Sequence, residues 1–346
     1  MTASANSEAP SLSSISRILI AAGLVVAVSA PAWAQESMAR DTWRTFMTNN
    51  PAGEEGCFHA SYPSTTWEAV YCEDVDPSDL PGHINQNGAP EVGGKGDYVA
   101  QTTKPMTLAS GGFAVSSISG LLSEVGVSEF NKNGVPLGIL GPDQYAVQLN
   151  TNRHSTTAAC ASHTGCQVWQ QFVYASNYPT ATSGGKVFMQ YWLFNWGSSK
   201  CPSTSWTKSG KVNCYKNSKL VSVPSLPITS LGQEGLSGTA KPKGFDTVTF
   251  VNGSDAYIVT GKDSVLDISS VWKQAEFNVV GNTGGAQAQF NPGITITVTL
   301  IVVDGTGTAP TCVTDAGTTG ESNNLSVGPC TAADQFFQYI TYTESN

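Results

Sequence analysis

The chain has 346 residues, of which 12% are charged, and its formal net charge at pH 7 is -9. The charged fraction is well below the usual ~25%, which is typical of a rigid exported β protein. An acidic chain without a basic run argues against nucleic acid as a partner.

The first 34 residues have the pattern of a secretory signal peptide. A polar start ends at Arg17, an apolar run follows over Ile18–Val28, and Ala32-Trp33-Ala34 precedes Gln35 as a small-residue cleavage site. No later segment has the ~20 uninterrupted apolar residues that a membrane-spanning helix needs. We therefore expect an exported protein, extracellular or periplasmic, that is a monomer and is not held in a membrane.

Residues 35–105 differ from the remainder of the chain. A short helix is predicted over Ser37–Met47, a loop closed by cysteines follows, and Pro, Gly and Asn are frequent over Pro77–Lys104. The segment has little apolar periodicity, so its sequence gives little reason to expect a hydrophobic core of its own. We expect an N-terminal arm packed on the core, or a propeptide.

From residue 106 to 346, short β-like runs recur between turn residues, with almost no helical pattern. The clearest alternation places Ile294, Ile296, Val298 and Leu300 on one face and threonines on the other, as expected where one face meets the core. These runs predict an all-β, two-sheet jelly-roll sandwich over residues 106–346. The predicted strands are Phe113–Ile118, Val125–Phe130, Gln144–Asn150, Gln167–Ala175, Val187–Trp196, Gly235–Thr239, Thr247–Val251, Ala256–Thr260, Ala275–Val280, Gln287–Phe290, Ile294–Val303 and Phe336–Thr343.

All eight cysteines follow the predicted cleavage site and fall into four close pairs along the chain. An even number in an exported chain favours disulfides over metal or redox use. We expect each cysteine to pair with its neighbour, although the sequence does not fix the connectivity. The expected pairs are Cys57 with Cys72, Cys160 with Cys166, Cys201 with Cys214, and Cys312 with Cys330.

Three of the predicted strands carry amide or carboxyl side chains among large apolar ones. Side chains alternate between the faces of a strand, so residues two apart share a face. If these strands belong to one sheet, they line a polar and aromatic groove. A buried carboxylate at Glu276 is costly and therefore suggests a function. The pairs that share a face are Trp169 with Gln171, Gln190 with Trp192, and Glu276 with Asn278.

Three segments, Leu226–Ala240, Asp246–Thr260 and Gln274–Val280, resemble in order and spacing the eqolisins, a glutamic peptidase family of secreted acid endopeptidases. Upstream, Cys166–Phe172 is similar to the family strand that carries the catalytic glutamine after a cysteine. The strand before it, Ala146–Asn150, departs from the family because it has neither Trp nor Asp. The resemblance covers roughly residues 144–303 and is one of pattern more than of identity.

The resemblance implies a concanavalin-like jelly roll that hydrolyses a polypeptide with a Gln/Glu dyad, without cofactor or metal. It places Glu276 at the catalytic glutamate, as general base to water and then acid to the leaving amine. Gln171 stands at the catalytic glutamine, whose amide donates to the oxyanion. Gln190, Trp192 and Asn278 are then expected to contact the substrate.

Alternatives remain open at this stage. Gln170 competes with Gln171, because a one-residue change of register exchanges their faces. Glycoside hydrolysis requires two facing carboxylates, and Glu276 has no obvious strand-borne partner. The four histidines show no metal-ligand spacing, and no Gly-x-Ser-x-Gly elbow indicates a nucleophilic serine. The alternative function is a non-catalytic sandwich that binds protein or a polysaccharide, with sugar rings on Trp169, Tyr191, Trp192 and Trp196.

Overall fold

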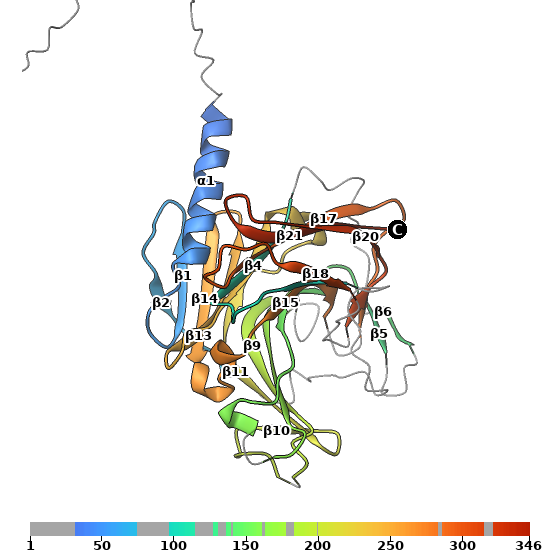
Figure 1. Ribbon diagram of the computed structural model, residues 1–346. Coiled ribbons are helices and arrows are strands. Elements are labelled where there is room, and N and C mark those ends of the chain that lie inside the picture. The colour runs from blue at the N-terminus through green and yellow to red at the C-terminus, as the bar shows by residue number, and fades with distance from the viewer. Residues whose placement is uncertain are drawn as a thin grey trace, which may run out of the picture. The chain divides into compact units, whose positions relative to one another are not determined.

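The computed structural model describes residues 32–74, 97–114, 127–130, 136–139, 141–160, 163–177, 183–198, 200–282, 286–314 and 321–346. The chain divides into residues 1–38 and 39–346, and the described strands all belong to the second unit (Figure 1). Most of the predicted signal peptide, residues 115–118 and residues 125–126 lie outside the described residues.

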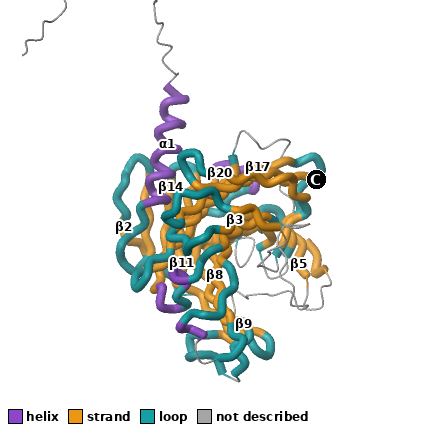
Figure 2. The backbone as a smooth tube through the Cα atoms, in the orientation of Figure 1, coloured by secondary structure: helices purple, strands orange, loops and turns teal. Residues whose placement is uncertain are grey.

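Strands dominate the described residues of the second unit, as the tube in Figure 2 makes clear, and they form two large sheets and one small one. The nine-stranded sheet has the order β2 (Glu68–Val70), β1 (Cys57–Ser61), β14 (Asp255–Lys262), β13 (Phe245–Asn252), β12 (Glu234–Thr239), β4 (Leu108–Phe113), β17 (Thr295–Val303), β21 (Gln338–Ser345) and β20 (Ser326–Ala333). The eight-stranded sheet has the order β10 (Thr207–Ser209), β11 (Asn213–Val223), β9 (Gly185–Phe194), β8 (Gln167–Ala175), β7 (Tyr145–Thr151), β15 (Gln274–Gly281), β3 (Tyr98–Gln101) and β18 (Thr311–Thr314).

The small sheet contains β19 (Ser322–Asn323), β16 (Gln287–Ala288), β5 (Val127–Phe130) and β6 (Pro136–Ile139). Short 3-10 helices connect some of the strands. They span Ala158–Cys160, Ile228–Gln233, Asp263–Val265 and Ile268–Ser270.

The two large sheets are antiparallel throughout and pack face to face around one hydrophobic core. The predicted alternation in β17 is confirmed: Ile296, Val298 and Leu300 are buried, while the threonines between them are half-buried. Burial of one face of each sheet is the main stabilising contribution in such a sandwich. The prediction of an all-β sandwich is therefore confirmed.

The inter-sheet core draws its side chains from alternate positions of facing strands. The eight-stranded sheet contributes Val147, Leu149, Phe172, Tyr174, Met189, Tyr191, Leu193, Phe277 and Val279. The nine-stranded sheet contributes Ala109, Phe113, Leu236, Val248, Phe250, Val259, Val298 and Leu300.

The sequence patterns did not predict β11, although it is the longest of the described strands, with 11 residues. Its register with β9 shifts between Asn217 and Leu220, which marks a bulge. A bulge interrupts the period-two pattern, so sequence alternation cannot reveal a strand that contains one. The strand β4 ends at Phe113, and only Phe113 and Ala114 of the strand predicted over Phe113–Ile118 are among the described residues.

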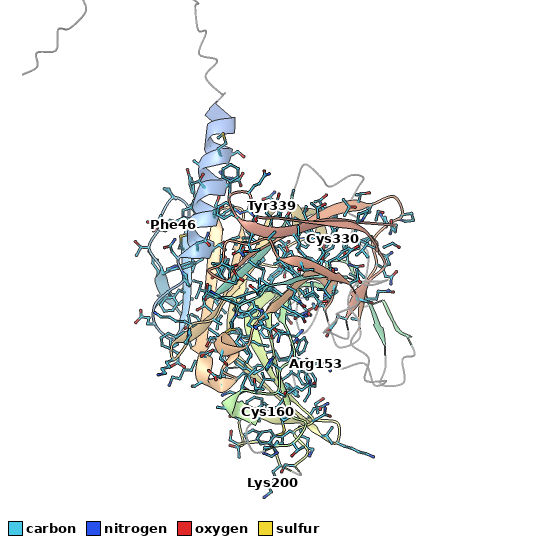
Figure 3. The ribbon with its side chains drawn as sticks, viewed as in Figure 1. Phe46, Arg153, Cys160, Lys200, Cys330 and Tyr339 are labelled. Carbon is cyan, nitrogen blue, oxygen red and sulfur yellow. A yellow bond between two sulfur atoms is a disulfide. The ribbon has the colours of Figure 1, made fainter. Side chains whose placement is uncertain are left out.

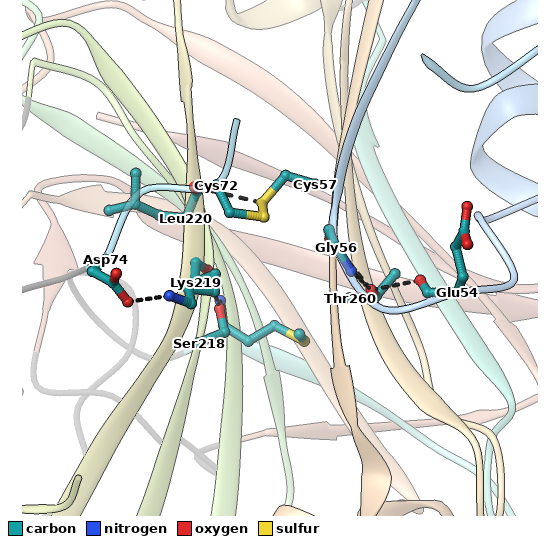
Figure 4. Close-up of a disulfide and its surroundings, with 10 residues drawn as sticks. Glu54, Gly56, Cys57, Cys72, Asp74, Ser218, Lys219, Leu220 and Thr260 are labelled. Atoms are coloured by element: carbon teal, nitrogen blue, oxygen red, sulfur yellow. Dashed lines mark hydrogen bonds and ion pairs between the residues drawn. A yellow bond between two sulfur atoms is a disulfide. The ribbon is translucent and has the colours of Figure 1, made fainter. Parts of the chain in front are cut away.

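Part of the segment predicted as an arm or propeptide is paired with the sheets. The strand β1 pairs with β14, and β3 lies between β15 and β18. The disulfide Cys57–Cys72 (Figure 4) joins β1 to the residues that follow β2. From there Glu73 exchanges two backbone hydrogen bonds with Leu220 of β11, at 2.9 and 3.1 Å. This segment therefore links the two large sheets at one end of the sandwich.

The helix α1 (Ala32–Asn49) is longer than the predicted helix at both ends. Its Trp43 and Met47 are buried against Ala60, Val251 and Ala256 of the nine-stranded sheet. No helix among the described residues is both long and apolar enough to cross a membrane.

Four disulfides join Cys57 to Cys72, Cys160 to Cys166, Cys201 to Cys214, and Cys312 to Cys330. They are the four pairs of sequence neighbours expected from the spacing. No free cysteine is found among the described residues.

Candidate functional site

A row of polar side chains crosses four adjacent strands of the eight-stranded sheet. Gln190 of β9 lies directly opposite Gln171 of β8, and Gln171 lies opposite Asn150 of β7. Asn150 in turn lies opposite Glu276 of β15. We call these four residues the amide row. Directly opposed residues have neighbouring side chains on one face, so the register alone brings the two predicted catalytic residues to the same row.

Hydrogen bonds connect three members of the amide row. Gln171 Nε2 donates to Asn150 Oδ1 at 3.1 Å and to Gln148 Oε1 at 2.9 Å. Asn150 Nδ2 donates to Glu276 Oε2 at 3.3 Å. Asn150 thus joins the predicted glutamine to the predicted glutamate, with one strand between them. An amide that donates to a carboxylate fixes the orientation of that carboxylate.

Asn150 and Gln148 were not among the predicted site residues. The segment Ala146–Asn150 was compared with the family only for a missing Trp and Asp, and that comparison gave no reason to select Asn150. The signal was the alternation of β7 itself, in which Gln148 and Asn150 share a face. All seven residues of β7 are buried, and two buried amides on one face need hydrogen-bond partners.

The adjacent glutamine, Gln170, faces the other way. Its Nε2 lies 3.6 Å from Met189 Sδ, inside the inter-sheet core. Gln171, not Gln170, therefore shares a face with Glu276. The register of β8 with β7 decides between the two amides, as strand geometry requires.

Two inter-sheet aromatic residues hold the strands of the amide row. Phe277 follows Glu276, and a Cβ on Gly111 of β4 would lie 2.1 Å from its ring. Phe172 follows Gln171, and a Cβ on Gly238 of β12 would lie 2.5 Å from its ring. Such distances are too short for any side chain, so glycine is required at both positions. The glycines let each aromatic ring pack closely against the opposite sheet. This packing holds the strand that carries the neighbouring polar residue in position.

An aromatic cluster lies on the same face as the amide row. It consists of Trp169, Trp192, Phe194 and Tyr215, which are all buried. The Trp192 ring stacks on Phe194 and Tyr215 at centroid distances of 5.3 and 5.1 Å. Trp192 Nε1 also donates to Gln190 Oε1 at 2.7 Å, and Gln190 Nε2 donates to Asn217 Oδ1 at 2.9 Å. The cluster therefore continues the amide row towards one end of the sheet.

The aromatic residues considered for sugar binding do not form an open platform. Trp192 is 0% exposed and Trp169 is 2% exposed. Tyr191 lies on the opposite face, in the inter-sheet core. The Trp196 ring stacks on the His163 ring, with 3.4 Å between the ring centroids. Stacking of a sugar ring needs an exposed aromatic face, and the two buried tryptophans do not present one.

Asn278, which is expected to contact substrate, lies beside a pair of buried carboxyl groups. Its Nδ2 donates to Asp97 Oδ2 and to Glu344 Oε1, each at 2.8 Å. Tyr342 OH donates to Asp97 Oδ1 at 2.5 Å and to the Phe277 carbonyl at 3.0 Å. We call Asp97 and Glu344 the carboxyl pair. Asn278 is the amide that bridges them.

Both members of the carboxyl pair bind protons more tightly than usual. Burial raises the pKa of Asp97 to about 7, although the hydrogen bonds from Tyr342 and Asn278 oppose the rise. Burial, and then the neighbouring Asp97, raises the pKa of Glu344 to about 8. Two like charges this close cannot both ionise cheaply, so the pair holds at least one proton in mild acid.

The amide row is closed to solvent in this structure. Glu276 is 1% exposed, and Gln171 and Gln190 are each 5% exposed. Burial in a low-dielectric environment strengthens the electrostatic interactions of the row. A substrate can contact these side chains only after a rearrangement that exposes them.

No family model and no curated protein matches this chain. Among solved structures, a match is found to scytalido-glutamic peptidase crystallised with a transition state analog inhibitor. The two chains are 11% identical, and the match covers 73% of this chain and 98% of that chain with a TM-score of 0.28. This is a weak likeness of fold, and no residue role is transferred from it.

Proposed function

We propose that this chain is an exported acid endopeptidase of the glutamic type, with Glu276 and Gln171 as its catalytic residues. The observation that carries the proposal is the hydrogen-bonded chain Gln171–Asn150–Glu276 on one face of three adjacent strands. The eqolisin-like pattern of the sequence supports the same two residues independently of this geometry. Export is supported by the signal-like leader and by four disulfides, which persist in oxidising compartments.

Hydrolysis of a peptide bond at this row assigns each residue a separate step. Glu276 accepts a proton from water, and the water oxygen bonds to the scissile carbonyl carbon. Glu276 then gives that proton to the leaving nitrogen as the C–N bond breaks, so that a carboxylic acid and an amine are released. Asn150 holds the Glu276 carboxylate in place through both steps.

Gln171 stabilises the negative charge that develops on the carbonyl oxygen. Its Nε2 carries two hydrogens, which contact Gln148 and Asn150 in the closed structure. The substrate oxygen replaces Gln148 Oε1 as an acceptor when the row opens. A neutral amide suits this role because it donates without requiring a particular pH.

The test is cleavage of denatured casein by the purified mature chain from pH 2 to pH 8, after an incubation in acid that allows the row to open. We expect cleavage confined to acid pH. Glu276→Gln removes the general base, so the rate should fall by roughly 10²–10⁴-fold. Circular dichroism and thermal unfolding must show that the variant remains folded.

Glu234→Gln is the matched control. Glu234 is also 1% exposed, but it lies in the nine-stranded sheet and accepts a hydrogen bond from Tyr145 OH at 2.5 Å. We expect Glu234→Gln to keep the casein-cleaving activity. Equal loss in both variants, or cleavage that survives Glu276→Gln, would contradict the assignment of Glu276.

A further inference from the structure

Arg153 is a half-buried cation on the face that bears the amide row. Its guanidinium carbon lies 4.0 Å from the centre of the Phe194 ring, a member of the aromatic cluster. Figure 3 labels Arg153 near the strands of the eight-stranded sheet and above Cys160 in this view. Among the described residues, no carboxylate forms an ion pair with Arg153.

Partial burial sets Arg153 apart from most of the described lysines. Most of the described lysines that form no ion pair are exposed, whereas Arg153 is half-buried. The buried Nε of Arg153 also has no hydrogen-bond partner among the residues described. Burial lowers the pKa of Arg153, with no opposing contribution from a carboxylate, yet arginine stays protonated in proteins. A cation kept partly desolvated and unpaired has a favourable interaction left to make.

The backbone on both sides of Arg153 is fixed. Asn152 Oδ1 accepts hydrogen bonds from the backbone N–H groups of Lys273 and Gln274, at 2.7 and 3.0 Å. His154 exchanges two backbone hydrogen bonds with Val168 of β8, at 3.1 and 2.7 Å. The backbone that carries Arg153 is therefore fixed, and the Phe194 ring packs against the guanidinium before any ligand arrives, which lowers the entropy cost of binding.

The register of β9 gives the distance between Arg153 and the amide row. Gln190, Trp192 and Phe194 share one face of β9, and Arg153 lies over the last of them. Four residues of a strand span about 13 Å. A substrate in the extended conformation covers that distance in about four residues.

We propose that Arg153 binds the side-chain carboxylate of an Asp or Glu about four residues from the scissile bond of a polypeptide substrate. The inference rests on the proposed function, whose substrate class it narrows to polypeptides with an acidic residue at one position. The planar guanidinium matches a carboxylate through two parallel N–H···O hydrogen bonds, and Phe194 holds its plane.

Acid conditions set a limit on this recognition, because an ordinary Asp or Glu loses its charge below about pH 4. The Arg153 charge favours the ionised carboxylate and moves that limit to lower pH. The preference for Glu over Gln is therefore expected to be full near pH 5 and to fade towards pH 2. A peptide with cysteic acid at the same position should keep its advantage throughout, because a sulfonate stays ionised.

The experiment uses peptides blocked at both ends, so that no terminal charge competes. Each carries one Glu or one Gln at a position between two and six residues from the bond, on either side. Binding to the folded Glu276→Gln variant of the mature chain is measured by tryptophan fluorescence, and cleavage by the wild type is measured in parallel. We expect Glu to be favoured by about ten-fold at one position, about four residues from the bond on one side.

Variants of Arg153 test the residue itself. Arg153→Gln should remove the ten-fold ratio, and Arg153→Lys should keep part of it, because lysine retains the charge but not the planar fork. Lys200→Gln is the matched control: Lys200 is exposed at the same end of the sheet (Figure 3) and lies over no aromatic ring among the described residues. It should leave the ratio unchanged.

The outcomes separate this inference from the proposed function. Glu-selective binding that depends on Arg153, without cleavage by the wild type, would support the acidic subsite and overturn the peptidase. Cleavage with no Glu preference at any position would support the peptidase and overturn the subsite. A preference that persists in folded Arg153→Gln would also overturn it.

Discussion

The two faces of the eight-stranded sheet bury the same kinds of residues in different ways. On the outer face, Gln171 joins a hydrogen-bonded chain that ends at Glu276. On the inner face, Gln170 lies near Asp246, a fully buried carboxyl group on β13 whose pKa is raised well above its usual value by burial. Burial of a carboxyl group alone therefore does not mark a functional site. What distinguishes the outer face is a chain of amide hydrogen bonds that crosses adjacent strands and ends at one carboxylate.

The largest expected effect is the pH dependence of the protein's free energy of unfolding, which the buried carboxyl groups cause. Burial raises the pKa of Glu234 to about 8, and burial together with Asp263 raises the pKa of Asp246 well above its usual value. Asp97 and Glu344 behave in the same way, at about 7 and about 8. The folded protein thus retains protons that the unfolded chain releases above about pH 4.

This linkage has a definite sign. The stabilisation is fully present below the unfolded pKa values near 4, and it is lost as the pH rises through the folded values of about 7 to 8. We expect the free energy of unfolding to be several kcal/mol greater at pH 4 than at pH 8. Thermal unfolding at each pH measures it, and Glu344→Gln should flatten the curve. A melting temperature that rises from pH 4 to pH 8 would refute the prediction.

The next effect separates the two glutamines directly. Gln171→Ala removes the oxyanion donor, so the rate of casein cleavage at acid pH should fall by roughly 10²–10³-fold. Gln170→Ala removes a side chain from the inter-sheet core and should lower the melting temperature while the remaining folded protein keeps its rate. Rates are compared at a temperature where both variants are folded. If Gln170→Ala lost more activity than Gln171→Ala, the assignment of faces to function would be wrong.

Two adjacent glycines of β4 sharpen the same contrast. A Cβ at Gly111 would lie 2.1 Å from the Phe277 ring, whereas a Cβ at Gly112 would have its nearest contact at 3.7 Å, with the Glu234 carbonyl. Gly111→Ala should therefore cost about 1–3 kcal/mol of stability, by overpacking. Gly112→Ala should change stability by less than about 1 kcal/mol, or increase it. Urea unfolding of both variants measures the difference, and equal costs would show that the ring can move away.

The smallest effect comes from the aromatic cluster. Trp192 Nε1 donates to Gln190, whereas Trp169 Nε1 has no hydrogen-bond partner among the described residues. Trp192→Phe and Trp169→Phe remove similar volumes, but Trp192→Phe also leaves the Gln190 acceptor without its donor. We expect Trp192→Phe to be the more destabilising by about 1 kcal/mol in urea unfolding. A larger cost for Trp169→Phe would mean that packing, and not the hydrogen bond, dominates there.

Local sequence patterns predicted most of the elements near the amide row. The run Gln167–Ala175 is β8 at the same residues, and the alternation of β17 was evident from its isoleucines and threonines. Period-two patterns persist where one face is buried and the strand is regular. The strand β11 escaped because its bulge breaks the period, and β3 because four residues are too few to show one.

The sequence by itself determined that this is an all-β sandwich, and it placed Gln171, Gln190 and Glu276 on strands. Both properties depend on local alternation, which a linear pattern records. The tertiary structure decided that Asn150 stands between Gln171 and Glu276, that Asn278 joins a carboxyl pair, and that Arg153 lies over Phe194. These contacts join residues far apart along the chain, and only the pairing register between strands sets which of them meet.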